Sequence, residues 1–115
     1  MADNREHPED GQDADAFDRR VGQVLDEEAG LLAEQSDLLI AAGSISVERP
    51  TGVLTAHLKP PTWWRQGELE IAAVTAGRSG SGSIPLSRAA YRDRTGLRGE
   101  IRLQLAVQLA WLEQE

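Results

Sequence analysis

Apolar residues recur at helical spacing in the first half of the chain, after a polar beginning. Residues 1–13 are almost wholly polar and acidic, so they cannot bury enough apolar surface to offset chain entropy, and we predict a disordered tail. The segment 14–42 carries apolar side chains three and four residues apart, which indicates an amphipathic helix. Gly43 stands where a left-handed residue would end this helix, and a break is expected near Ser36-Asp37. The supporting positions are Phe17, Val21, Val24, Leu25, Leu31, Leu32, Leu38 and Leu39.

The pattern changes from a helical to a strand-like period after this helix. Residues 44–48 alternate, and residues 53–58 are apolar with β-branched members, so both segments are predicted strands. The segment 49–52 (Arg-Pro-Thr-Gly) is typical of a turn and therefore predicts a hairpin. Two prolines at 60 and 61 end the second strand, because proline has no N–H for the ladder. Residues 68–76 form the third predicted strand.

The last apolar segment combines strand-like alternation with helix-forming residue types. Six apolar residues two positions apart would scatter around a helix but share one face of a strand, whereas Leu, Gln, Ala and Glu prefer helices. Periodicity is the stronger signal, so we predict a long strand within 97–115 and keep a helix as the alternative. Before it, residues 77–83 are a predicted flexible Ser/Gly loop, and 84–96 are assigned no regular structure. The alternating residues are Ile101, Leu103, Leu105, Val107, Leu109 and Trp111, the last expected in the core.

These elements predict an α+β fold in which an N-terminal helix packs on a small antiparallel β-sheet of about four strands. A length of 115 residues suits one domain. We therefore divide the chain into a disordered acidic tail, residues 1–13, and a single α+β domain, residues 14–115.

The composition excludes several classes of protein. The chain has no cysteine, so it has neither disulfides nor thiolate metal ligands, and its two distant histidines give no metal site. No apolar stretch approaches the roughly 20 residues of a membrane-spanning helix, and the N-terminus lacks the apolar core of a secretory signal. We expect a cytoplasmic protein without metal, cofactor or membrane partner.

Charge is distributed unevenly along the sequence. Residues 1–48 contain thirteen acidic and three basic residues, whereas residues 49–115 contain six acidic and nine basic residues. Such asymmetry is typical of an acidic tail that contacts a basic partner or folds back on its own basic half. A tail that only keeps the protein soluble has the same composition, and we favour this simpler interpretation.

The sequence shows no catalytic constellation. Gly77 and Gly82 have the spacing of a phosphate-binding loop, but Ser83 stands where that loop needs Lys. Two serines in the same loop lack the Gly-x-Ser-x-Gly setting of a nucleophile. His57 is a candidate general base, yet on a strand beside Leu58 it is expected to be an ordinary surface or half-buried side chain.

The first candidate binding group is a cluster of arginines between residues 78 and 102. Arginine suits phosphate and carboxylate ligands, which points to an anionic partner, including nucleic acid. Only Tyr91 interleaves with the arginines, whereas stacking platforms for nucleic acid usually hold more aromatic rings. Pairing with this chain's own carboxylates is the simpler alternative. The members are Arg78, Arg88, Arg92, Arg94, Arg98 and Arg102.

The second candidate group is Trp63-Trp64-Arg65, directly after the two prolines. Trp and Arg are enriched among the residues that dominate binding energy at interfaces. Neighbouring side chains of an extended chain point to opposite faces. We therefore expect either one buried and one partly exposed tryptophan, or two that cover the open end of the core.

The leading functional hypothesis is a non-enzymatic protein–protein interaction or assembly module, with self-association as one form of that interaction. Its candidate binding residues are Trp63, Trp64, Arg65, Arg88, Arg92, Arg94 and Arg98. One alternative is a nucleic-acid-associated regulatory protein that uses the arginine-rich segment 78–102. Another is a small ligand-binding or enzymatic domain whose site we do not recognise, and a closed apolar pocket beside His57 would support it.

Overall fold

The computed structural model describes the backbone of residues 2–113 and the side chains of residues 15–113. Residues 2–13, where we predicted a disordered tail, have a helical backbone in the structure and no described side chains, and the disordered tail stays an untested prediction. The elements follow in the order α1 (Ala2–Glu27), α2 (Ala29–Ala42), β1 (Ser44–Arg49), β2 (Gly52–Lys59), β3 (Gly67–Thr75), β4 (Ser79–Leu86), α3 (Arg88–Arg92) and α4 (Arg94–Glu113).

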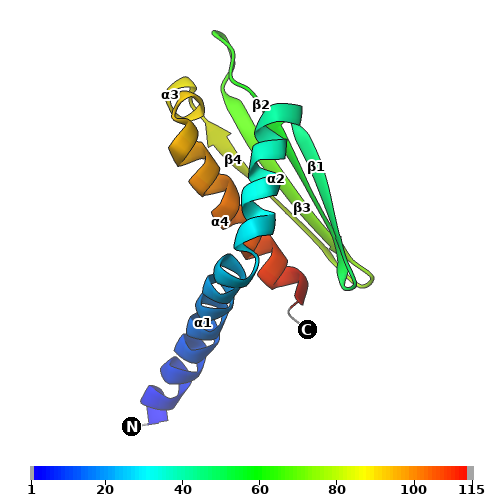
Figure 1. The fold of residues 1–115 in the computed structure, drawn as a ribbon. Coiled ribbons are helices and arrows are strands. Elements are labelled where there is room, and N and C mark those ends of the chain that lie inside the picture. Colours follow the sequence, from blue (N-terminus) through cyan, green and yellow to red (C-terminus); the bar gives the residue numbers. More distant parts are fainter. Residues whose placement is uncertain (1, 114–115) are drawn as a thin grey trace.

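The four strands form one antiparallel sheet in the order β1-β2-β3-β4. Helices α2 and α4 cover one face of this sheet, and the opposite face is open (Figure 1). Alternate residues of β2 and β3 point into the core between the layers; Leu54, Leu69 and Ala73 are fully buried there. The predicted α+β class, with helix packed on a four-stranded antiparallel sheet, is confirmed.

The predicted first hairpin is also confirmed. Arg49 pairs with Gly52, so the Pro-Thr dipeptide between them forms a tight turn. Strand β2 ends at Lys59, immediately before the two prolines. Gly52 is required at its position because an added Cβ would lie 2.2 Å from the Val74 carbonyl oxygen.

The predicted long helix is divided, at a different place from the one expected. The break lies at Glu28, between α1 and α2, and not near Ser36-Asp37. Ser36 is buried inside α2, where its hydroxyl donates to the Leu32 carbonyl oxygen at 2.7 Å; this local bond satisfies the side chain without ending the helix. Gly43 ends α2 as predicted, with φ of 87° and its N–H bonded to the Leu39 carbonyl oxygen.

The C-terminal segment is helix α4, so the predicted strand within 97–115 is wrong over the described residues. The buried residues of α4 follow helical spacing and include two alanines that the alternation treats as its outer face. Leu103, an alternating residue, is 42% exposed, and Trp111 is only half-buried. Helix propensity and the burial of small residues together override the alternation. The buried positions are Leu97, Ile101, Leu105, Ala106, Leu109, Ala110 and Leu112.

The fourth strand is β4, which replaces the predicted loop 77–83 and part of the unassigned segment 84–96. It pairs with β3 without interruption, from the pair of Gly67 with Leu86 to the pair of Val74 with Ser79. The sequence does not predict this strand, because glycine weakens a strand interior and β4 is rich in glycine and serine. Gly80 lies beside Trp111, and a Cβ added to Gly80 would make an ordinary contact with the Trp111 ring at 3.6 Å.

Candidate functional site

Antiparallel pairing brings the two candidate groups to the same end of the sheet. The β2–β3 loop, residues 60–66, joins the strand ends at Lys59 and Gly67, and Gly67 pairs with Leu86 at the end of β4. Helix α3 begins two residues after Leu86. Figure 1 shows the loop and α3 at the upper end, opposite the hairpin turns of β1–β2 and β3–β4.

The β2–β3 loop is closed by a tight turn with the two tryptophans at its tip. The Thr62 N–H donates to the Arg65 carbonyl oxygen at 2.8 Å, which leaves Trp63 and Trp64 as the central residues of the turn. They are 83% and 65% exposed. Both therefore project into solvent, and the structure departs from both arrangements that the sequence predicted for this pair. The Arg65 guanidinium lies 5.4 Å from the Trp64 ring centroid.

Helix α3 and the start of α4 hold further arginines at this end. Ser87 caps α3 by accepting from the Ala90 N–H at 3.0 Å, and Arg88 and Arg92 of this short helix are exposed. The Arg94 guanidinium lies 4.4 Å from the Tyr91 ring centroid. We define the loop-end surface as Trp63, Trp64, Arg65, Arg88, Arg92 and Arg94.

The loop-end surface is electropositive. Residues 60–66 and 87–94 together contain four arginines and one aspartate, a formal excess of three positive charges. The aspartate, Asp93, accepts from the Gly96 N–H at 3.1 Å near the start of α4. Among side chains 15–113, no ion pair engages Arg88, Arg92 or Arg94. These cations are thus available to an anionic ligand.

The other arginines of the predicted cluster have different places in the fold. Arg98 makes a two-point ion pair with Asp37 of α2, with its Nε 2.8 Å from Oδ1. Arg78 lies at the opposite end of the sheet, where it stacks 4.2 Å from the Trp111 ring centroid. Arg102 is half-buried on α4. Arg98 therefore fits the simpler interpretation of pairing within the chain, whereas the exposed arginines define the binding candidate.

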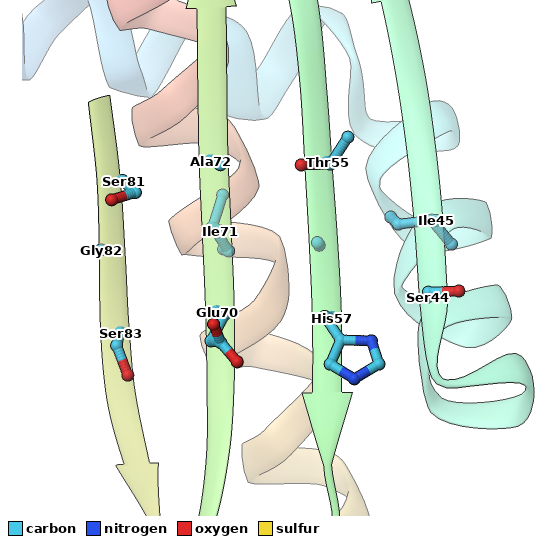
Figure 2. A pocket seen from close by; sticks show the side chains of 11 residues that line it. Ser44, Ile45, Thr55, His57, Glu70, Ile71, Ala72, Ser81, Gly82 and Ser83 are labelled. Carbon is cyan, nitrogen blue, oxygen red and sulfur yellow. The ribbon is translucent and has the colours of Figure 1, made fainter. Parts of the chain in front are cut away.

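The open face of the sheet carries a second candidate, a depression of about 540 Å³ (Figure 2). Ser44, His57, Glu70 and Ser83 form one row across the four strands. Figure 2 shows these side chains on the side of the sheet away from the helices. His57 is exposed, in agreement with the surface position expected for it. The depression is open to solvent, so it is not the closed pocket that would support an enzymatic domain.

The polar groups of this depression are arranged as surface ion pairs rather than as a proton relay. The Lys59 ammonium lies 2.8 Å from a Glu70 carboxylate oxygen. A hydrogen bond and the charge of Lys59 lower the pKa of Glu70, and the same contact raises the pKa of Lys59. Ser83 donates its hydroxyl to Glu68. Within residues 15–113 no hydrogen bond joins His57 to Ser44 or Glu70, so His57 is not placed to activate a serine there.

Two further classes of site are absent from the part of the chain that the structure describes. No group of three or more His, Asp or Glu side chains there is placed to hold a metal ion. None of the described helices combines the length and the apolar character needed to cross a membrane.

Comparisons with known proteins give no functional lead. No protein-family model matches the chain, and searches of curated proteins and of solved structures find no significant similarity. The function must therefore be argued from the loop-end surface itself.

Proposed function

We propose that the protein is a non-enzymatic interaction module that binds an anionic protein partner through the loop-end surface. The carrying observation is the exposure of Trp63 and Trp64, 83% and 65%, at the tip of a tight turn beside unpaired arginines. Exposed large apolar groups that are rimmed by polar residues mark interaction sites on soluble domains.

The two tryptophans supply the binding energy in this proposal. A buried aromatic side chain withdraws about 150–250 Å² from water, and truncating a central anchor of this kind typically costs 2 kcal/mol or more. The turn presents both rings on a backbone that Pro60, Pro61 and the Thr62–Arg65 hydrogen bond constrain. Such preorganisation lowers the entropy lost on binding.

The arginines orient the partner on the surface and raise the rate of association. A positive patch steers a negative partner toward the surface and rejects positive ones, with an effect on the association rate that falls as salt rises. Arg88 and Arg92 are exposed on α3, so their guanidinium groups can form two-point contacts with carboxylates. The combination favours an acidic polypeptide that covers the tryptophans.

Single-stranded nucleic acid is the second candidate ligand, for one specific reason. From the sequence, too few aromatic rings accompany the arginines, but the fold brings Trp63 and Trp64 to the same end as Arg88 and Arg92. Rings beside cations are what stacking sites for single strands use. Quenching of tryptophan emission by an oligothymidylate, reversed by salt, would support this candidate.

Site-specific photo-crosslinking in cells that produce the protein tests the proposed function. A crosslinking amino acid replaces Trp63, and we expect discrete protein adducts that disappear when Arg88→Glu and Arg92→Glu are added. The matched control is the same crosslinker at Val74, which is 51% exposed on the open face of the sheet. Equal adducts from both positions, or none from position 63, would contradict the proposal. Adducts that nuclease removes would assign the surface to nucleic acid.

A further inference from the structure

The acidic N-terminal segment and the basic loop-end surface lie at opposite ends of the molecule. Residues 1–18 contain seven acidic residues and one arginine, and the backbone of residues 2–18 belongs to α1. Helix α1 is anchored farther along, where Val21 and Val24 are buried in the core. Figure 1 shows α1 leaving the body on the side away from α3 and the β2–β3 loop. The acidic segment and the loop-end surface thus face in opposite directions.

With α1 helical, the two charged regions lie at opposite ends of the molecule and do not neutralise each other (Figure 1). The longest dimension of the protein is 56 Å, whereas charges are screened over about 8 Å at physiological salt. Helix α1 has 26 residues, about 39 Å at the rise of an α-helix, and Arg20 pairs with Glu113 of α4 near its anchored end. The alternative in which the acidic tail folds back on its own basic half is therefore disfavoured.

We infer that the anionic partner of the loop-end surface is the acidic segment of a second copy, residues 1–18. This inference rests on the proposed function and names its ligand. The complementarity is the formal excess of three positive charges at one end against a formal excess of six negative charges in residues 1–18. Arginine stems and the tryptophan rings cover the helix that carries those carboxylates.

The contact is head-to-tail, because the loop-end surface of one copy binds the acidic segment of the next copy, and its own acidic segment binds the loop-end surface of another. Such a contact generates a ring or an open chain of copies rather than a closed two-fold dimer. The arginine–carboxylate part of the contact is electrostatic, so association strengthens at low ionic strength and weakens toward 1 M salt, where the screening length is about 3 Å.

Light scattering of two charge-reversed variants tests this geometry. The head variant is Arg88→Glu/Arg92→Glu, and the tail variant is Asp10→Lys/Asp13→Lys. At low salt we expect the unchanged protein to exceed its monomer mass of 12.5 kDa and each variant alone to remain monomeric. A mixture of the two should assemble again, because the intact head of the tail variant meets the intact tail of the head variant.

A charge-matched pair of variants removes the general effect of net charge. Arg88→Gln/Arg92→Gln lowers the charge by two at the loop-end surface. Thr51→Glu/Ser79→Glu lowers it by two near the other end of the sheet, at exposed positions. Only the first pair should abolish assembly at low salt.

Two results would overturn the inference. One is a monomer mass of the unchanged protein at every salt concentration; the other is a mixture that stays monomeric although the unchanged protein assembles. If either occurs while crosslinks from position 63 persist in cells, the proposed function stands with a different partner. Loss of both signals would remove the proposed function as well.

Discussion

Replacing Gly67 with alanine should destabilise the protein by distorting the base of the β2–β3 loop. Gly67 is buried at the start of β3. An added Cβ would lie 2.5 Å from the Lys59 carbonyl oxygen and 2.7 Å from both the nitrogen and Cδ of Pro61, whereas ordinary contacts begin at 3.4 Å. These neighbours are backbone and ring atoms, so relief requires movement of the loop itself.

The expected cost follows from this overlap. Forcing an extra methyl group into a packed site typically costs about 1–3 kcal/mol, while the lower entropy of alanine in the unfolded chain returns about 0.4–1 kcal/mol where the backbone is compatible. We therefore expect a net loss of about 1–2 kcal/mol. With a urea dependence of about 1–3 kcal/mol per molar, the unfolding midpoint should fall by roughly 0.5–1 M.

Urea unfolding followed by circular dichroism measures this loss. The matched control is Gly77→Ala in the β3–β4 turn, where nothing lies within 4 Å of the added Cβ and φ is not positive; its midpoint should stay level or rise. A midpoint of Gly67→Ala equal to that of the unchanged protein would refute the steric reasoning.

Three further predictions concern stability. Leu105→Ala should cost about 2–5 kcal/mol in urea unfolding, because it empties a fully buried site on α4. Ser87→Ala should cost about 1 kcal/mol and speed amide exchange in α3, because the Ala90 N–H loses its acceptor. Lys59 lowers the pKa of Glu70 below its ordinary value of 4.5, so the charged form of Glu70 stabilises the fold. The stability difference between the unchanged protein and Glu70→Gln should be present above pH 4.5 and vanish as pH falls through the lowered pKa.

The parts of the fold that depend on local chemistry were predictable from the sequence. Gly43 ends a helix because glycine tolerates its φ of 87°, and the Arg-Pro-Thr-Gly segment turns because proline presets its backbone. The apolar residues of 14–42 identified the helical region, although its division at Glu28 has no such local signal.

The two wrong assignments both concern segments whose structure is fixed by packing. Alternation within 101–112 favoured a strand, yet Ala106 and Ala110, on the other face of that alternation, are fully buried, as helical spacing allows. In β4 a Ser/Gly segment forms a strand because its backbone pairs with β3 along its whole length, and the Trp111 ring lies beside Gly80. The segments that pack on α4 and β4 are distant in the sequence, so the local sequence does not predict these contacts.

The candidate site was predictable by residue type but not by position. The sequence selected both the Trp-Trp-Arg motif and the arginines, but not that antiparallel pairing places them at one end of the sheet. The exposure of both tryptophans follows from the Thr62–Arg65 turn. The same pairing separates Arg78 from Arg88 and Arg92, which share one segment of the sequence.

Hydroxyl-radical footprinting of the tryptophans, in intact cells and in dilute purified protein, tests the central claim most directly. Trp63 and Trp64 should be oxidised rapidly in the dilute protein and be protected in cells, where a partner covers the loop-end surface. Trp111, half-buried beneath Arg78, is the internal reference and should react alike in both. Equal oxidation of Trp63 and Trp64 in cells and in dilute solution, relative to Trp111, would contradict the claim that this surface binds a partner.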